Sequence, residues 1–136
     1  GQGTGDRGTV AAGRSGPGGL VGWGASREGP HAIPAQATGS PYLAVVPHGE
    51  LNEGAPVMPP DRWAALLAWA REERDRVIVV ASPLSRRADG LTLARLVDGT
   101  ILVLTPGQTT ATAAARAQDA IRQAGGSILG VVLADR

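Results

Sequence analysis

The sequence contains no cysteine, no phenylalanine and no lysine, since all 13 of its basic residues are arginine. Without cysteine, the chain can form neither a disulfide nor a thiolate metal site. Without lysine, it contains neither the phosphate-binding lysine of a P-loop nor a lysine that forms a Schiff base. Aromatic residues make up 3% of the chain, so the core is predicted to be aliphatic and rich in alanine.

Charge and hydropathy exclude two further classes of partner. The net charge of +1 at pH 7 gives no electrostatic basis for binding nucleic acid or an anionic membrane surface. No apolar run approaches the roughly 18 residues of a membrane-spanning helix, and no signal peptide opens the chain. We therefore expect no nucleic-acid partner and no direct membrane insertion.

Glycine and proline divide the chain into two parts. Of the 20 glycines and 10 prolines, 22 lie in the first sixty positions. This distribution predicts an irregular leader over residues 1–40 and an α/β domain over residues 41–136. Residues 3–8 match the G-x-G-x-x-G pattern of dinucleotide sites, but only two residues precede them in this sequence, so we expect no strand within it to lead into the pattern. We interpret them as part of the leader.

Three apolar runs, at residues 77–81, 101–104 and 128–133, organise the second part. They do not alternate with polar residues, a pattern typical of parallel strands buried on both faces. The segments between them are long enough for crossover helices, one capped at Asp89 and the other at Thr109 or Thr110. The predicted fold class is α/β, with a mostly parallel three-layer sheet and flanking helices.

Two further elements are predicted upstream of these runs. A short strand is predicted at residues 42–46. A helix opening near Asp61 carries an apolar stripe at helical spacing. The stripe consists of Trp63, Leu66, Leu67 and Ala70.

Ligand sites of open parallel sheets lie beyond the carboxyl ends of the strands. The loop after the first of the three runs carries Arg86 and Arg87, which are placed to meet an anion, although a solvated pair of loop residues is the favoured interpretation. The candidate positions at these strand ends are Ser82, Pro83, Arg86, Arg87, Asp89, Thr105, Pro106 and Ala134. His31 and His48 are interpreted as solvated side chains. A two-histidine metal site is the alternative, and we predict no metal.

Several of these segments resemble bacterial tyrosine kinases, the cytoplasmic P-loop ATPases of the MinD/ParA group that govern capsule and exopolysaccharide chain length. Residues 75–83 resemble D-x-V-I-I-D-T-P-P, residues 88–104 resemble D-A-x-x-L-A-x-x-V-D-G-V-L-L-V, and residues 126–133 resemble G-x-x-I-L-G-V-V-L-N up to its closing asparagine. Residues 43–49 are similar to L-x-V-L-P-A-G, and Gly19-Leu20 to the start of G-L-S. The resemblance spans residues 19–134 and implies an incomplete P-loop NTPase-like (Rossmann-like) core and a cytoplasmic location.

The departures from the family pattern fall on the residues that carry its chemistry. We expect the P-loop to be missing, together with the pair of aspartates that ends the following strand. The acidic residue that helps to organise Mg²⁺ in the family is matched by Val80, and the asparagine expected to contact adenine is matched by Ala134. We therefore predict no catalytic residue and no cofactor. The candidate positions listed above are at most remnants of a nucleotide site.

Three hypotheses follow from this comparison. The first is a non-catalytic, degenerate relative that acts as an interaction module, docking on an active homologue or on a membrane chain-length regulator. The second is an ATPase or kinase subunit that binds Mg-ATP once a partner chain completes it. The third is a small α/β binding module unrelated to nucleotides. In each case a missing strand would leave an exposed sheet edge, which predicts a protein partner or self-association.

Overall fold

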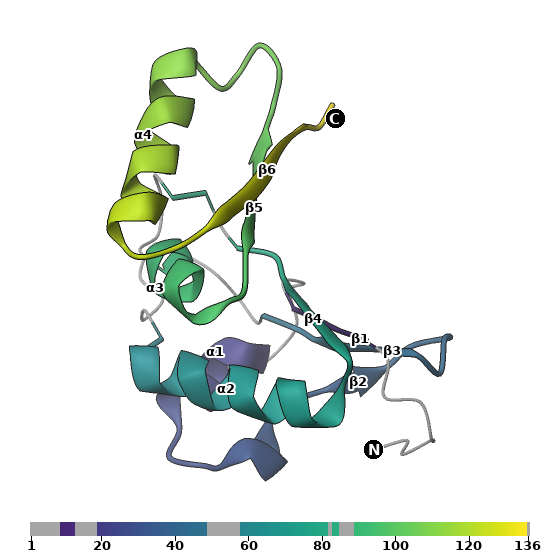
Figure 1. Ribbon diagram of the computed structural model, residues 1–136. Coiled ribbons are helices and arrows are strands. Elements are labelled where there is room, and N and C mark those ends of the chain that lie inside the picture. The colour runs from purple at the N-terminus through teal and green to yellow at the C-terminus, as the bar shows by residue number, and fades with distance from the viewer. Residues whose placement is uncertain (1–8, 13–18, 49–57, 82, 85–88, 136) are drawn as a thin grey trace. The chain divides into compact units, whose positions relative to one another are not determined.

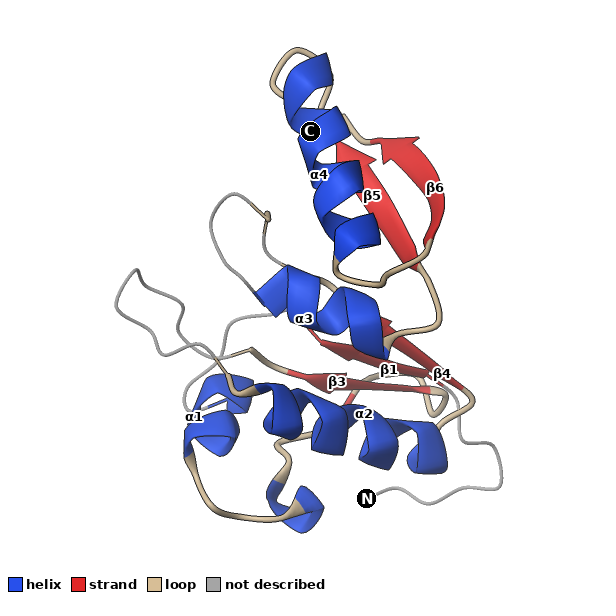
Figure 2. Cartoon of the chain, turned by 60° about the vertical axis from the view of Figure 1, so that its left-hand side comes forward, coloured by secondary structure: helices blue, strands red, loops and turns tan. Residues whose placement is uncertain are grey.

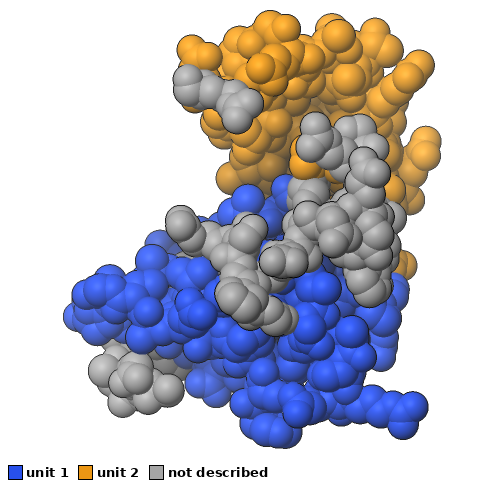
Figure 3. All heavy atoms as spheres, turned by 180° about the vertical axis from the view of Figure 1, so that it is seen from behind, with its two compact units in different colours: residues 1–81 blue, residues 82–136 orange. Residues whose placement is uncertain are grey.

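The computed structural model describes residues 9–12, 19–48, 58–81, 83–84 and 89–135 (Figure 1). The chain divides into two compact units, residues 1–81 (unit 1) and residues 82–136 (unit 2), which Figure 3 distinguishes by colour. None of the helices formed by the described residues has the length and apolarity needed to cross a membrane.

Unit 1 is built on a four-stranded sheet with the order β2-β3-β1-β4. β1 lies parallel to both β3 and β4, whereas β2 lies antiparallel to β3. In chain order the described elements are β1 (Thr9–Ala12), α1 (Gly19–Ala25), the 3-10 helix η1 (Pro30–Ala32), β2 (Gln36–Ala37), β3 (Leu43–Val46), α2 (Pro60–Glu73) and β4 (Arg76–Val79). Several of these elements lie before residue 41, where the sequence led us to expect an irregular leader.

β1 joins β3 to β4 within this sheet, and both of these partner strands are distant from it in sequence. Its four residues pair with β3 on one side and with β4 on the other. The β-strand propensity of its sequence, Thr-Val-Ala-Ala, is weak. Pairing with the two partner strands therefore stabilises β1. This is why the local pattern did not predict it.

The strands of unit 1 present one buried face and one open face. Ala44 and Val46 are buried, and the register places Val77 and Val79 in the same rows across β1. Figure 2 shows α1 and α2 on one side of this sheet, which accounts for the buried face. The alternate positions, among them Val45 and Ile78, form the open face.

The core of unit 1 contains the apolar stripe of α2. As predicted, Trp63, Leu66, Leu67 and Ala70 are all buried. The first turn of α1 is tied to the segment after β3, because the Leu20 amide donates to the Pro47 carbonyl oxygen at 2.7 Å. Burying each large apolar side chain contributes roughly 1.5–3 kcal/mol, so the buried stripe of α2 stabilises the unit by several times that amount.

Arg62 joins α2 to α1 from the polar side of this core. Its guanidinium carbon lies 3.7 Å from the centroid of the Trp23 ring, a cation–π arrangement. The same guanidinium donates to the Trp23 carbonyl oxygen at 2.7 Å, and the Trp23 indole donates to the Gly29 carbonyl oxygen at 3.0 Å. Trp23 is thus a buried packing residue.

Unit 2 contains a parallel pair of strands with helices on one side. Its described elements are α3 (Asp89–Leu96), β5 (Thr100–Leu104), α4 (Ala111–Gln123) and β6 (Ile128–Leu133). β5 and β6 pair in parallel, with an irregularity in register between Thr100 and Ile101. α4 packs on β6 and on α3, and Leu93, Ala94 and Ile121 form the buried centre. These bounds agree with the predicted elements within two residues.

The prediction that the three apolar runs are buried on both faces is wrong. Burial alternates along β4 and along β5, and Ile78, Ile101 and Val103 are all more than half exposed. The residues on both faces of each run are apolar, so the sequence does not reveal that buried and exposed positions alternate. The α/β class and the mostly parallel pairing are confirmed, but the described strands form two sheets, and a three-layer arrangement is not observed.

Replacing Leu67 by alanine tests the importance of the α2 stripe. Leu67 is almost fully buried, so Leu67→Ala should lower the free energy of unfolding by about 2–5 kcal/mol. The matched control is Val80→Ala, an exposed aliphatic position in the same unit, which should change it by less than about 0.5 kcal/mol. Urea denaturation followed by far-UV circular dichroism measures both. Equal losses would contradict this description of the core.

Candidate functional site

The carboxyl end of β5 opens into a tight turn over residues 105–109. The Gln108 and Thr109 amides both donate to the Thr105 carbonyl oxygen at 3.0 Å, and the Thr105 amide donates to the Thr109 hydroxyl at 3.2 Å. Gly107 has φ of +78°, which favours glycine over any residue with a side chain. The turn is therefore held by three hydrogen bonds of its own, and the chain continues from it into α4.

Thr110 is the N-cap of α4. Its backbone is extended, and its hydroxyl accepts a hydrogen bond from the Ala113 amide at 3.0 Å. This confirms one of the two predicted caps. Thr109 has the different role of closing the preceding turn.

The end of β6 lies beside the end of β5. The Ala134 amide donates to the Leu104 carbonyl oxygen at 2.9 Å, which continues the strand pairing past β6. Parallel topology thus places Thr105 and Pro106 next to Ala134, as expected for strand ends in one sheet. Ala134 has only a methyl side chain, so it cannot replace the amide that the family resemblance expects for contact with adenine.

The end of β4 has the same apolar character. Val80 follows the last residue of β4 and is 63% exposed. At the position of the expected acidic residue, the chain therefore exposes an aliphatic side chain with no metal ligand. Pro83 is exposed, whereas Asp89, the first residue of α3, is buried. Ser82, Arg86 and Arg87 lie outside the described residues.

The described strand ends do not fit Mg-ATP. Mg²⁺ prefers oxygen ligands in octahedral geometry, usually carboxylates together with phosphates. Neither Val80 nor Ala134 supplies such an oxygen, and the described residues bring together no group of three or more His, Asp or Glu side chains able to hold a metal ion. His31 and His48 accordingly belong to no such group.

Comparison with protein-family models gives no match, and comparison with curated proteins gives none either. Solved structures do match. The kinase domain of Escherichia coli tyrosine kinase ETK superposes with a TM-score of 0.74 and 22% identity, covering 94% of this chain. The BceF tyrosine kinase domain superposes with a TM-score of 0.73 and 20% identity, covering 96%. The fold is that of a bacterial tyrosine kinase domain.

The chain spans 55% of the length of the ETK domain and 57% of the BceF domain. The predicted similarity to bacterial tyrosine kinases is confirmed at the level of an α/β fold, whereas the predicted three-layer sheet is not observed. Activity, substrates and partners of the complete kinases do not transfer with it, because a fold hosts many functions and the chemistry lies in the site.

Removing the Thr110 cap tests the local structure of the candidate site. Thr110→Ala should lower the free energy of unfolding by about 0.5–2 kcal/mol, because the Ala113 amide loses its acceptor. Thr112→Ala, an exposed position inside the same helix, is the control and should be neutral or slightly stabilising. Chemical denaturation monitored by circular dichroism compares the two. A loss at Thr112 as large as that at Thr110 would exclude the capping role.

Proposed function

We propose that this chain is a non-catalytic, degenerate relative of the ATPase and tyrosine-kinase proteins that regulate capsule or exopolysaccharide biosynthesis, and that it acts as an interaction module. One observation carries the proposal. The kinase-like fold is retained, while the strand ends that would carry its chemistry hold Val80 and Ala134.

The physical argument concerns how phosphoryl transfer is catalysed. The protein contributes mainly positioning and electrostatic stabilisation, through Mg²⁺, cationic groups and backbone amides that hold the phosphates. Val80 offers no ligand for the metal, and the chain has no lysine to neutralise the phosphates. Arg86 and Arg87 supply two cations in the sequence between β4 and α3. Without a metal ligand nearby, two arginines can support weak anion binding at most, and they do not suffice for phosphoryl transfer.

The open strand faces support an interaction role. Ile78 and Val80 in unit 1, and Ile101 and Val103 in unit 2, are each more than half exposed. Contiguous exposed apolar surface commonly marks a site of protein–protein interaction. Through the family resemblance, the partner class we favour is a protein of the polysaccharide machinery. A membrane chain-length regulator would hold this module at the cytoplasmic face of the membrane.

Calorimetric titration with Mg-ATP and with Mg-ADP tests the proposal. We expect no saturable heat up to millimolar nucleotide, because the strand ends lack the metal ligand and the amide-bearing side chain. The matched control is the same titration of a Val80→Asp, Ala134→Asn double variant, which carries the side chains of the family pattern at these two positions. Micromolar binding of Mg-ATP or Mg-ADP by the unaltered chain would overturn the proposal of a non-catalytic function. Its loss in an Arg86→Ala, Arg87→Ala variant would then locate the phosphate site and favour the nucleotide-binding alternative.

A further inference from the structure

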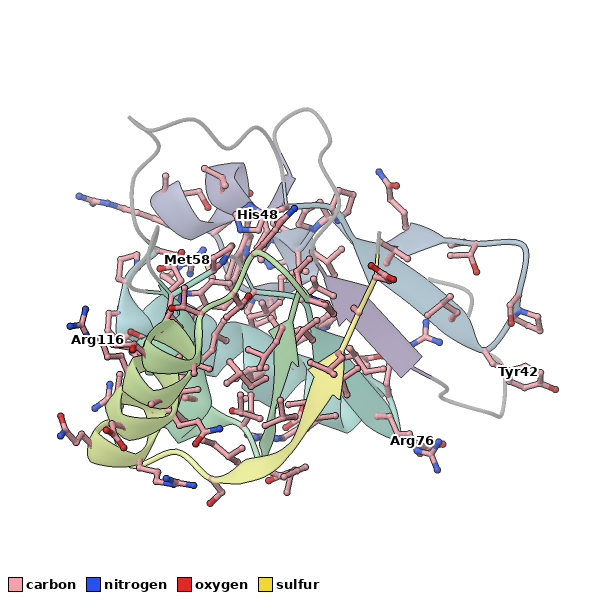
Figure 4. The ribbon with its side chains drawn as sticks, turned by 90° about the horizontal axis from the view of Figure 1, so that it is seen from above. Tyr42, His48, Met58, Arg76 and Arg116 are labelled. Carbon is pink, nitrogen blue, oxygen red and sulfur yellow. The ribbon has the colours of Figure 1, made fainter. Side chains whose placement is uncertain are left out.

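Met58 carries the only sulfur atom of the chain, because the sequence has one methionine and no cysteine. It precedes Pro59, the N-cap residue of α2, and its side chain is 8% exposed. Figure 4 shows Met58 among other side chains, whereas Tyr42 projects away from the ribbon. Any chemical change of a thioether in this protein therefore occurs at one buried position.

The sulfur of Met58 packs against the backbone of α1 at Gly24. Gly24 is buried, and a Cβ atom added there would overlap the Met58 sulfur and lie 2.7 Å from Met58 Cγ. Glycine permits a close approach that any side chain would prevent. Met58 thus occupies the place that the side chain of another residue at position 24 would need.

A second residue at the beginning of α2 holds the same turn of α1. Arg62 stacks on the Trp23 ring and donates to the Trp23 carbonyl oxygen at 2.7 Å. At the other end of α1, the amides of residues 20 and 21 donate to the carbonyl oxygens of residues 47 and 48, at 2.7 and 2.9 Å. These carbonyls follow β3, so α1 connects the start of α2 with the carboxyl end of β3.

We propose that the contact between Met58 and Gly24 is oxidation-sensitive, so that the thioether keeps α1 on α2 and the sulfoxide releases it. The oxidant is a hydroperoxide, of which hydrogen peroxide is the simplest. The sulfur loses two electrons and gains one oxygen atom, while hydrogen peroxide is reduced to water. The inference goes beyond the proposed function, because it requires neither a nucleotide nor a partner.

Two changes oppose the docked position of α1 after oxidation. The sulfoxide oxygen adds volume to a side chain that already fills the space beside Gly24. Oxidation also converts a flexible apolar group into a polar one. A buried polar group without a hydrogen bond is costly, and moving α1 aside gives the new oxygen access to water.

Docking of α1 and oxidation of Met58 are thermodynamically linked. The docked helix shields the sulfur, so oxidation proceeds through the state in which α1 has moved away. The sulfoxide then favours that same state. Because α1 also bonds the segment after β3, oxidation changes the carboxyl end of a sheet strand, where the ligand sites of such sheets lie.

Hydrogen exchange of the Leu20 and Val21 amides, measured by NMR before and after treatment with hydrogen peroxide, tests the proposal. Mass spectrometry verifies that one oxygen has been added at Met58. We expect exchange at both amides to become at least about tenfold faster, while exchange at Thr100, whose amide donates to the Ser127 carbonyl oxygen in unit 2, stays unchanged. An oxidised chain with unchanged exchange at Leu20 and Val21 would overturn the proposal. So would equal acceleration at Thr100, or a sulfur that excess peroxide leaves unoxidised.

Met58→Leu is the matched control, because leucine has a similar volume and no oxidisable sulfur. Peroxide should leave the exchange of residues 20 and 21 unchanged in this variant. Reduction of the oxidised, unaltered chain by methionine sulfoxide reductases should restore the original exchange. An equal response of Met58→Leu to peroxide, or no recovery on reduction, would contradict the role of the thioether.

A pair of glycine substitutions tests the contact without any oxidant. Gly24→Ala places a methyl group where the Met58 sulfur lies, so it should accelerate exchange of residues 20 and 21 at least about tenfold. Gly22→Ala is the control in the same helix, because a Cβ atom there has no neighbour within 4 Å and alanine favours a helix. Circular dichroism verifies that both variants are folded. Equal exchange in the two variants would show that Gly24 has no special contact and would overturn the proposal.

Discussion

One-sided burial of the parallel sheets is the constraint on which the rest of this structure depends. In unit 1 the α2 stripe covers one face of a sheet whose other face remains open, and unit 2 repeats this with α3 and α4. A sheet needs apolar cover to be stable, and each buried side chain contributes only a few kcal/mol. The open faces are equally apolar, so the same force that folds each unit also favours further association.

The elements that local periodicity determines were predicted from the sequence. The stripe of α2 lies at helical spacing, and the run of β6 is bounded by turn residues, so both were placed correctly. β1 could not be found in this way, because a short run of small residues becomes a strand only through partners elsewhere in the chain. The prediction that helices cover both faces of the strands was also wrong. The sequence does not distinguish an apolar residue that a helix covers from one that is exposed.

The candidate site was predictable only in part, for a related reason. Parallel topology requires the ends of β5 and β6 to lie side by side, so the proximity of Thr105 and Ala134 follows from the element order. The turn that Thr109 closes depends on one side-chain hydrogen bond, which no pattern in the sequence singles out. The fold can also be predicted without the chemistry, because the apolar residues that stabilise the strands are different from those that would bind a nucleotide.

The distribution of aromatic residues gives the two units different optical properties. Trp23, Trp63, Trp69 and Tyr42 all belong to unit 1, and the chain has no phenylalanine. Near-ultraviolet absorption and intrinsic fluorescence therefore come from unit 1 alone, and the guanidinium over Trp23 makes that emission sensitive to the contact between α1 and α2. Unit 2 is visible only through its backbone signal. Melting curves recorded by fluorescence and by backbone signal will thus coincide only if the two units unfold together.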